Sequence, residues 1–310
     1  MPSEFEIIRK YFARAPKQAV LGVGDDCALV RVDAGAELAI STDMLLEGRH
    51  FAAGADPRSL GHKALAVNLS DMAAMGATPR WATLALALPG ADEKWVAAFA
   101  RGLYALAERY DVDIVGGDTT RGPLTICITI FGEIPAGLAL YRAGARPGDD
   151  IWVSGALGGA SLALERKKPK ASARRLHEPE PRVELGERLR GIASSAIDVS
   201  DGFAQDLGHI LERSGVGALV HYDRLPRDPS LAREEDPRLI ARCVLAGGDD
   251  YELVFTARQD ARAEIEAVSA ELELPLARVG AIQRGGTRLQ LLGAQGKPMA
   301  VPRGFDHFRS

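Results

Sequence analysis

Aspartates that stand beside glycine, serine or threonine recur along this 310-residue chain. They form six short motifs, most of which directly follow or precede an apolar run: Gly24-Asp25-Asp26, Ser41-Thr42-Asp43, Asn68-Leu69-Ser70-Asp71, Gly116-Gly117-Asp118-Thr119-Thr120, Asp198-Val199-Ser200-Asp201-Gly202 and Gly247-Gly248-Asp249-Asp250. Carboxylates brought together at strand ends and helix starts repel one another unless cations neutralise them, and hard divalent ions prefer oxygen ligands. Carboxylate-held metal ions are also how proteins bind the phosphates of ATP. The motifs therefore predict a Mg²⁺-dependent phosphoryl-transfer site.

Two of the six motifs are stronger indicators than the rest. A single Asp-Gly turn is common in ordinary loops, because aspartate accepts hydrogen bonds from nearby backbone amides. Between Asp198 and Gly202, however, two carboxylates and a serine precede a helix, although a helix N-cap needs only one of them. Between Asn68 and Asp71, polar residues interrupt an otherwise apolar helix, where a buried charge is costly unless it is paired or bound to metal.

The usual nucleotide-binding and hydrolase motifs are absent from the sequence. There is no Gly-x-x-x-x-Gly-Lys-Ser/Thr loop, no protein-kinase His-Arg-Asp or Asp-Phe-Gly set, and no third glycine at the Rossmann position after Gly22 and Gly24. No Gly-x-Ser-x-Gly elbow marks a serine hydrolase. The net charge of −4 gives no support for nucleic-acid binding.

Bulk properties indicate a soluble protein of the cytoplasm. The three cysteines, Cys27, Cys127 and Cys243, are far apart and form no Cys-x-x-Cys pair, so they predict neither a zinc site nor a disulfide framework. The first ten residues contain two glutamates and no long apolar stretch, unlike a signal peptide. The longest nonpolar run, residues 82–90, is too short to span a membrane.

Hydrophobic periodicity predicts the elements that must position the aspartates. Ser3 and Glu6 form a capping-box pattern that opens a first helix. Further helices are expected over 57–75, 92–110, 158–165, 203–214 and 259–272. Strands are expected over 27–32, 37–41, 81–88, 112–115, 124–133, 151–154, 196–199, 218–222, 251–256 and 277–282, with a turn at 116–120. The basic, proline-rich residues 166–181 indicate a mobile surface loop.

Strands alternate with helices in both halves of the chain, which predicts two α/β-type domains. The glycine- and proline-rich stretch Arg142–Asp149 places the boundary there or just before it. The expected domains are therefore 1–140 and 141–310. Because aspartate-rich turns occur in both halves, we expect the site to lie between the domains.

Six phrases of the sequence, in their order, resemble one enzyme family. They are Gly-Val-Gly-Asp-Asp-Cys-Ala-Leu (22–29), Ile-Ser-Thr-Asp-Met (40–44), Lys-Ala-Leu-Ala-Val-Asn-Leu-Ser-Asp-Met-Ala-Ala-Met-Gly-Ala (63–77), Gly-Gly-Asp-Thr-Thr-Arg-Gly (116–122), Ile-Asp-Val-Ser-Asp-Gly (197–202) and Gly-Gly-Asp-Asp-Tyr-Glu-Leu (247–253), followed by Gly304-Phe305-Asp306-His307-Phe308. Together they resemble thiamine-monophosphate kinases, within the superfamily of aminoimidazole ribonucleotide synthetase, selenophosphate synthetase and the hydrogenase-maturation dehydratase.

The resemblance implies a fold and a reaction. The fold is a two-domain α/β architecture like that of aminoimidazole ribonucleotide synthetase. Its α+β N-terminal domain would bind ATP and Mg²⁺ and form a homodimer through its sheet, and its α/β C-terminal domain would close the active-site cleft. The reaction is direct in-line transfer of the ATP γ-phosphate to thiamine monophosphate, assisted by several Mg²⁺ ions. It yields thiamine diphosphate and ADP, as the final step of thiamine diphosphate biosynthesis. Because the acceptor is a phosphate oxygen that is already anionic, no catalytic general base is expected.

Residue by residue, the resemblance implies three sets of contacts. Metal ligands are expected at Asp26, Ser41, Thr42, Asp43, Asp71, Asp118, Asp198 and Asp201. ATP contacts are expected at Tyr110, Gly117, Asp118, Arg142 and Ser200, where the arginine suits phosphate oxygens because guanidinium forms a fork of hydrogen bonds. Substrate contacts are expected at His50, Asp249 and Phe305. The family commonly has Glu at the position of Asp249, so either Asp249 or Asp250 makes this contact, with Asp249 favoured by the alignment.

Other functions lack part of this pattern. Selenophosphate synthetase needs a reactive cysteine in its N-terminal loop, but residues 1–21 contain none. The hydrogenase-maturation relative ends in a cysteine, and this sequence ends Phe308-Arg309-Ser310. Aminoimidazole ribonucleotide synthetase is the main alternative, because it shares the ATP-binding architecture. A protein that binds Mg-ATP without turnover is a further alternative of a different class.

Overall fold

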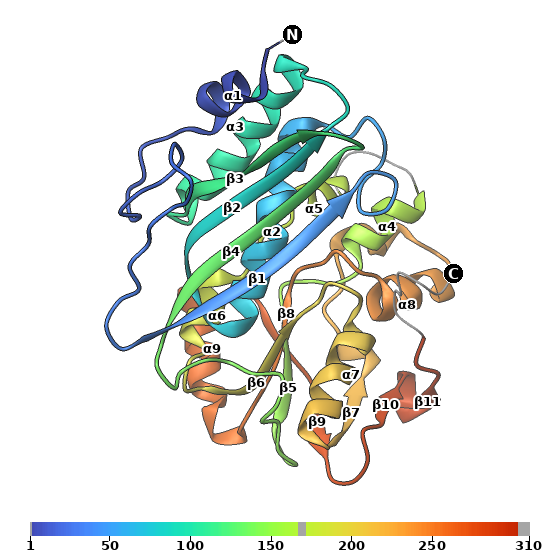
Figure 1. The fold of residues 1–310 in the computed structure, drawn as a ribbon. Helices are drawn as coiled ribbons and strands as arrows, with labels where there is room; N and C mark the ends of the chain where they lie inside the picture. Colours follow the sequence, from blue (N-terminus) through green and yellow to red (C-terminus); the bar gives the residue numbers. More distant parts are fainter. Residues whose placement is uncertain (1, 167–171, 303–310) are drawn as a thin grey trace. The chain divides into compact units, whose positions relative to one another are not determined.

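The computed structural model describes residues 2–166 and 172–302. The chain divides into two compact units. Unit 1 consists of Met1–Met72 and Ala77–Gly137, and unit 2 consists of Ala73–Gly76 and Leu138–Ser310. Each unit has its own sheet and is described separately below (Figure 1).

Unit 1 is built on a four-stranded sheet in the order β1-β4-β2-β3. Its strands are β1 (Ala36–Leu46), β2 (Thr78–Leu88), β3 (Asp113–Arg121) and β4 (Thr125–Pro135). Strand β4 runs antiparallel to β1 and β2, whereas β2 and β3 are parallel. Helices α2 (Pro57–Met75) and α3 (Glu93–Arg109) form the second layer of this unit (Figure 1). Between the layers, Ile126, Ile128 and Ile130 of β4 are at most 1% exposed.

The two helices of unit 1 pack closely because glycines lie where they meet. A Cβ on Gly61 would stand 2.1 Å from the carbonyl oxygen of Phe99, and one on Gly102 would stand 1.8 Å from that of Arg58. Helix α3 begins at the N-cap Asp92, whose carboxylate accepts hydrogen bonds from two backbone amides of the first turn. The helices predicted over 57–75 and 92–110 are thereby confirmed.

Unit 1 differs from the sequence expectation in two places. The capping box at Ser3 and Glu6 is present and opens α1 (Glu4–Ile7), which continues as a π-helix, η1 (Ile8–Phe12). The strand predicted over 27–32 is wrong, because only an isolated bridge joins Leu21 to Leu29. The turn predicted at 116–120 is also wrong, because β3 runs through these residues beside β2.

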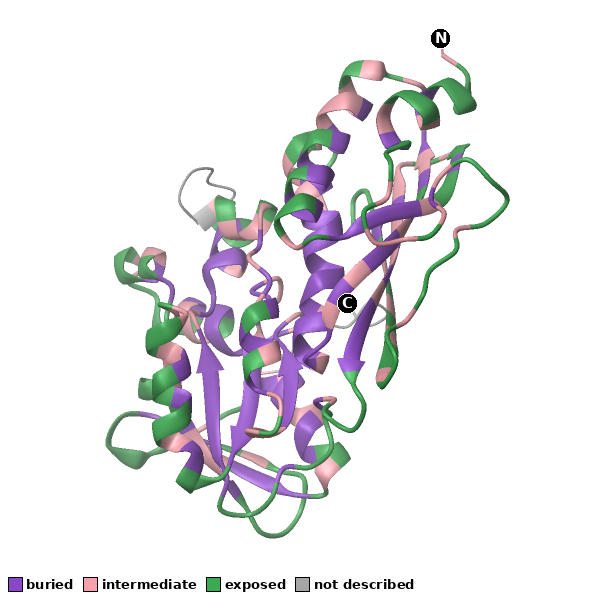
Figure 2. Ribbon diagram, turned by 90° about the vertical axis from the view of Figure 1, so that its left-hand side faces the viewer, coloured by how far each residue is buried: buried purple, intermediate pink, exposed green. Residues whose placement is uncertain are grey.

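Unit 2 is built on a seven-stranded sheet in the order β11-β10-β7-β9-β5-β8-β6. The strands are β5 (Asp150–Ser154), β6 (Ala193–Asp198), β7 (Gly217–His221), β8 (Leu253–Ala257), β9 (Leu276–Gln283), β10 (Leu289–Leu292) and β11 (Pro298–Met299). Strands β7 and β10 pair in parallel, and the other neighbouring strands of this sheet pair antiparallel. The central strands β5 and β8 are buried at every position (Figure 2).

The helices of unit 2 are α4 (Gly159–Arg166), α5 (Ser172–His177), α6 (Val183–Arg188), α7 (Phe203–Ser214), α8 (Pro237–Ala246) and α9 (Arg262–Glu271). Short 3₁₀ turns lie at η2 (Tyr222–Arg224), η3 (Pro229–Arg233), η4 (Gln259–Ala261) and η5 (Ala294–Gly296). Helix α7 has the predicted bounds, and its apolar side, including Phe203, Leu207 and Ile210, belongs to the core of this unit. The loop predicted at 166–181 is wrong in its second part, where α5 forms; residues 167–171 lie outside the described part of the chain.

A short piece of the first half of the sequence belongs to unit 2. Residues Ala73–Gly76 include the last turn of α2, and the carbonyl of Gly76 accepts a hydrogen bond of 2.6 Å from Nε of Arg190. The carbonyl of Met75 accepts one of 3.0 Å from the amide of Leu140. Among the residues described, no helix has the length and apolarity required to cross a membrane.

Candidate functional site

Two carboxylates and a hydroxyl meet between β1 and α2 of unit 1. Ser41 and Asp43 lie two residues apart on β1, so their side chains share one face of the sheet. The hydroxyl of Ser41 donates a hydrogen bond to Oδ2 of Asp71 on α2, which shows that this face is turned toward the helix. Burial and, to a lesser degree, the negative charge of Asp71 raise the pKa of Asp43 to about 7. The arrangement favours a proton or a cation beside these carboxylates.

Thr42 and Asp118 lie on the opposite face of the same sheet. The hydroxyl of Thr42 is 2.9 Å from that of Thr129, its register partner on β4. Asp118 pairs with Ala85, Ala85 with Cys127, and Cys127 with Met44, so Asp118 shares a face with Met44 and Thr42. The predicted ligands of unit 1 are thus divided between two faces, with Asp118 exposed to solvent.

Gly117 is required by the backbone next to Asp118. Its φ is +143°, a value that side-chain-bearing residues rarely adopt, and a Cβ would stand 1.8 Å from the carbonyl oxygen of Leu84. A glycine here lets β3 approach β2 and leaves the backbone beside Asp118 open. The nucleotide contact expected at Gly117 and Asp118 stays a prediction.

The other predicted residues of unit 1 lie on three separate segments. Asp26 is exposed in the loop before β1, where its amide donates to the carboxylate of Asp25 at 2.9 Å. His50 follows β1, and its Nδ1 accepts a hydrogen bond of 3.0 Å from the amide of Leu46, which fixes the ring against the strand end. Tyr110 is the C-cap of α3, with the guanidinium of Arg109 5.1 Å from its ring centre.

In unit 2, the predicted residues Asp198, Ser200 and Asp201 occupy the connection from β6 to α7. Asp198 ends β6 and is only 4% exposed. The carboxylate of Asp201 accepts a hydrogen bond of 3.2 Å from Nε2 of Gln205. The three residues, close in sequence, therefore lie together at the N-terminal end of α7. Such a position favours negative ligands such as phosphate.

Asp206, in the first turn of α7, contacts this loop and was missed from the sequence. Its Oδ2 accepts hydrogen bonds from the amides of Asp201, at 3.1 Å, and Gly202, at 3.0 Å. Burial and the charge of Asp201 raise the pKa of Asp206 to about 7. The signal available was an acidic residue in the first turn of a helix that begins at glycine, without a side-chain cap.

The segment 247–252 lies directly against that loop. The amide of Asp249 donates to the carbonyl of Ser200 at 3.0 Å, and the amide of Tyr251 donates to that of Val199 at 2.9 Å. Asp249 and Tyr251 have φ values of +64° and +50°, which are unusual for residues other than glycine. The hydroxyl of Tyr251 donates to Oδ1 of Asp249 at 3.1 Å.

The structure separates the roles of the two neighbouring aspartates. Asp250 is 5% exposed, and its Oδ2 accepts a hydrogen bond of 2.7 Å from the amide of Gly158. Burial raises the pKa of Asp250 well above its ordinary value. Asp249 is only half-buried, so of the two it is the carboxylate that a ligand reaches more easily.

Arg142 and Phe305 complete the predicted set. Arg142 is exposed before β5, its carbonyl accepts a hydrogen bond of 3.3 Å from the hydroxyl of Ser214, and its charge acts on Asp206. It therefore belongs to the surroundings of the β6–α7 loop. Phe305 lies outside the described residues.

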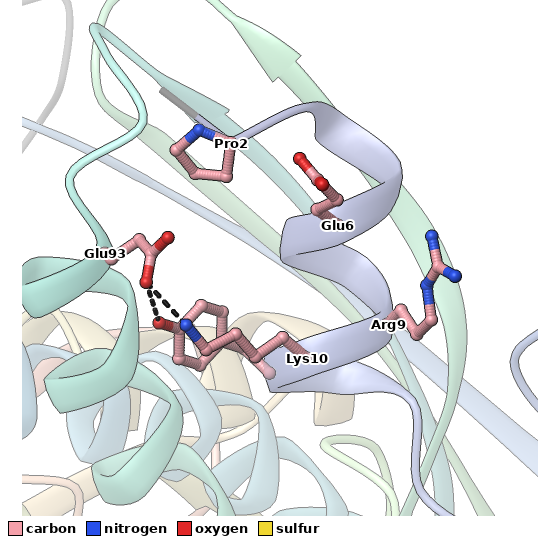
Figure 3. Close-up of a pocket in the computed structure, with 6 residues that line it drawn as sticks. Pro2, Glu6, Arg9, Lys10 and Glu93 are labelled. Carbon is pink, nitrogen blue, oxygen red and sulfur yellow. Dashed lines mark hydrogen bonds and ion pairs between the residues drawn. The ribbon is translucent and has the colours of Figure 1, made fainter.

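Two further observations limit the site. Within 2–166 and 172–302, no three His, Cys, Asp or Glu side chains are grouped closely enough to hold a metal ion by themselves. A cavity of about 440 Å³ near the N-terminus contains none of the predicted residues. Three of its polar side chains contact one another, because Lys10 and Tyr11 both contact Glu93, at 2.5 and 3.0 Å (Figure 3).

Models of known protein families match both units. The AIR synthase related protein, N-terminal domain, matches residues 24–134, and the AIR synthase related protein, C-terminal domain, matches residues 146–291. The fold and the site thus define a two-domain protein of the AIR synthase-related class, which confirms the predicted fold class.

Individual relatives identify one family within this class. The thiamine-monophosphate kinase of Salmonella typhimurium is 44% identical over 98% of each chain. The crystal structure of thiamine-monophosphate kinase from Stenotrophomonas maltophilia K279a is 42% identical, with a TM-score of 0.85 over 95% of this chain and 96% of that one. A structure of AaThiL complexed with AMPPCP and TMP is 28% identical, with a TM-score of 0.77 over 98% and 95% of the two chains. The chain belongs to the thiamine-monophosphate kinase family, and it is an enzyme of the kinase class.

Proposed function

We propose that this chain transfers the γ-phosphoryl group of ATP to thiamine monophosphate, giving thiamine diphosphate and ADP as the last step of thiamine diphosphate biosynthesis. Nearly end-to-end similarity to thiamine-monophosphate kinases supports the substrates, and so does the relative whose structure holds AMPPCP and TMP. The observation in this chain that carries the proposal is the pair of carboxylates, Asp43 and Asp71, next to the hydroxyl of Ser41. A reaction between two polyanions needs such a place for cations.

Mg²⁺ fits the carboxylates of this site. The raised pKa of Asp43 reflects repulsion by Asp71 as well as burial, and a divalent cation would offset both effects. Mg²⁺ commonly takes one or two carboxylates and completes its shell with water and substrate phosphates, so a group of three acidic side chains is not required. The proposed ligands are Asp26, Ser41, Thr42, Asp43, Asp71, Asp118, Asp198 and Asp201. When bound, several Mg²⁺ ions supply neutralisation of the phosphate charge.

The chain's own residues would bind and orient the two substrates. For ATP we propose Tyr110, Gly117, Asp118, Arg142 and Ser200, with the guanidinium of Arg142 pairing with phosphate oxygens. For thiamine monophosphate we propose His50, Asp249 and Phe305; a carboxylate and an aromatic ring suit a cationic ligand. Transfer is direct and in line, and no side chain acts as general base, because the attacking phosphate oxygen is already anionic.

The two domains have different roles in this proposal. Residues 1–140 bind ATP and Mg²⁺ and form a homodimer, and residues 141–310 contribute Arg142, Ser200 and Asp249. The homodimer is supported by the exposed apolar side chains on β1, where Ile40 is 59% and Met44 is 52% exposed.

A direct product assay tests the function. Purified protein is incubated with Mg-ATP and thiamine monophosphate, and thiamine diphosphate is separated and quantified. Free thiamine and the amidine precursor of aminoimidazole ribonucleotide serve as rival acceptors. We expect product from thiamine monophosphate alone, and loss of activity after metal chelation that returns with Mg²⁺. Turnover of the amidine instead would assign the chain to the synthetase reaction, and bound Mg-ATP without any turnover would indicate a binding protein.

The in-line mechanism has its own test. ATP made chiral at the γ-phosphorus with oxygen isotopes should yield a product of inverted configuration, because a single in-line displacement inverts the phosphorus centre. Retention of configuration would indicate two transfers through a phosphoenzyme.

A further inference from the structure

A fully buried carboxylate lies at the end of the segment that carries Asp249. Glu252 precedes β8 and is 0% exposed. Arg182, the residue before α6, holds it with a two-pronged ion pair: Nε lies 2.7 Å from Oε2, and a terminal nitrogen lies 2.6 Å from Oε1. The hydroxyl of Ser154 donates a third hydrogen bond, of 2.6 Å, to Oε2. Such a geometry fixes both the position and the orientation of the carboxylate.

The surrounding residues leave Glu252 no alternative position. Gly155 has a φ of +56°, and a Cβ on it would stand 2.0 Å from Oε1 of Glu252. Arg175 of α5 approaches from the other side, with a terminal nitrogen 3.2 Å from Oε1 and Nε 3.0 Å from Asp228. Two arginines from the stretch between α4 and α6 therefore converge on one buried carboxylate.

The backbone of Glu252 connects this ion pair to the candidate site. Its carbonyl accepts a hydrogen bond of 2.8 Å from the amide of Val199. The residues just before it, Asp249 and Tyr251, have positive φ. Such backbone conformations persist only when the surrounding structure holds them. The anchored side chain of Glu252 lies one residue after this strained turn and resists its relaxation.

We propose that Arg182 is a positioning residue for substrate binding: through its ion pair with Glu252 it holds the turn 249–251, and so the carboxylate of Asp249, in place. The proposal rests on the proposed function, in which Asp249 contacts thiamine monophosphate. Besides its hydrogen bonds to the segment 249–252, the β6–α7 loop has a second anchor in Asp206, which accepts hydrogen bonds from the amides of Asp201 and Gly202. Loss of the two-pronged ion pair at Arg182 should therefore weaken the binding of thiamine monophosphate more than the binding of ATP.

The decisive variant is Arg182→Lys, which keeps the positive charge next to Glu252 but cannot form the fork. We expect the KM for thiamine monophosphate to rise about tenfold or more, as for other groups that orient a binding residue, with a change of less than about threefold in the KM for ATP. The matched control is Arg188→Lys in α6, where the ion pair with Glu271 is exposed on both sides. The control should leave both KM values unchanged.

A second measurement does not depend on catalysis. Hydrogen–deuterium exchange of the ligand-free protein should be faster in the peptide 247–253 of Arg182→Lys and unchanged in that peptide of Arg188→Lys. If Arg182→Lys fails to fold, the double variant Arg182→Met/Glu252→Gln removes both charges together, and it should show the same faster exchange.

The outcomes separate the two proposals. A folded Arg182→Lys protein with normal KM values and normal exchange overturns the positioning role. An equal rise in both KM values also overturns it, since that result indicates a general structural role. If the unaltered protein makes no thiamine diphosphate, the proposed function fails, and the exchange measurement still decides whether Arg182 holds the turn.

Discussion

Neighbouring carboxylates in this protein have different surroundings, and the difference decides which of them solvent can reach. Asp250 is buried against the amide of Gly158, whereas Asp249 is half-buried one residue earlier. Asp43 and Asp71 are close enough that the charge of one raises the pKa of the other. A buried carboxyl group with a raised pKa can stay protonated and uncharged, whereas two carboxylates that repel each other favour a cation.

Replacement of the Asp71 carboxylate by the uncharged amide of asparagine tests the cation site. Asp71→Asn should lower kcat by roughly 100-fold or more, because charge stabilisation at a phosphoryl-transfer site is usually worth at least that much. The fold should survive, since asparagine still offers an oxygen to the hydroxyl of Ser41. Kinetics and circular-dichroism melting measure the two effects. Asp111→Asn, at an exposed ion pair with Lys17, is the matched control; a folded Asp71→Asn enzyme with normal kcat would contradict the cation site.

Asp250 should make stability depend on pH. Its pKa is raised in the folded protein by burial, so the folded state holds a proton that the unfolded chain releases above its ordinary pKa of 3.8. The contribution of Asp250 to stability therefore falls as the pH rises above about 4. Asp250→Asn, which cannot ionise, should lose less stability than the unaltered protein between pH 5 and pH 8. Melting temperatures across this range measure the difference, with the exposed Asp260→Asn as control. Parallel curves of melting temperature against pH for Asp250→Asn and the unaltered protein would refute this contribution of Asp250.

At the residue scale, the sequence could indicate the aspartates but not their partners. Short motifs showed where carboxylates gather, and Ser41, Asp43 and Asp71 do meet in unit 1. The opposite orientation of Thr42 follows from the extension of β1 through Leu46, whereas the strand predicted from the sequence ended at residue 41. The ion pair of Arg182 with Glu252 joins residues 70 positions apart, and no local pattern predicts such a pair.

At the scale of elements, glycine decides how closely β3 approaches β2. Gly117 has a φ of +143°, and a Cβ on it would stand 1.8 Å from the carbonyl oxygen of Leu84. A Cβ on Gly116 would meet only the methyl group of Thr83, at 3.8 Å. The two neighbouring glycines thus have different importance. The Gly-Gly pair resembles a turn in sequence, which explains why the strand through it was not predicted.

Alanine at the two positions should have unequal effects. Gly117→Ala should lower the melting temperature of the protein by at least about 4 °C, because a strained backbone alone costs of order 1–3 kcal/mol. Gly116→Ala should change it by less than about 2 °C, because the added methyl makes an ordinary contact. Differential scanning fluorimetry of both variants is sufficient. Equal melting temperatures would show that β3 can move away from β2 at no cost.

Elements with strong periodicity were predicted well, and elements held by tertiary contacts were not. Helix α7 has its predicted bounds because apolar residues repeat at helical spacing over several turns, and α2 has them because it is a long apolar segment buried on nearly all sides. Helix α5 is short and basic, and Arg175 within it contacts Glu252 and Asp228. Its charged composition resembles a surface loop, so the sequence alone could not indicate a partly buried helix.

At the scale of the whole molecule, the edge strand β1 predicts self-association. Leu38, Ile40, Met44 and Leu46 are 38–59% exposed and lie on one face of this strand. Exposed apolar rows on an edge strand are usually covered by a partner. A second copy of the chain, as in the proposed homodimer, is the simplest such partner.

A charge in this row should separate the subunits. Light scattering after gel filtration should give twice the chain mass of 33.1 kDa for the unaltered protein and a single chain mass for Ile40→Glu. Leu164→Glu, at an apolar residue of α4 that is 66% exposed, should leave the mass unchanged. A monomeric unaltered protein would refute the homodimer, and a dimeric Ile40→Glu protein would place its interface elsewhere.

The membership of Ala73–Gly76 in unit 2 has a consequence for how the protein is made. Arg190, which donates to the carbonyl of Gly76, leaves the ribosome 114 residues after it. During translation, Ala73–Gly76 therefore cannot complete its contacts in unit 2 until Arg190, synthesised much later, is available. A separately expressed fragment 138–310 would lack that segment, and the surface of Gly186, where a Cβ would stand 2.1 Å from the carbonyl oxygen of Ala73, would lose its cover. No single cut in the chain yields both units intact.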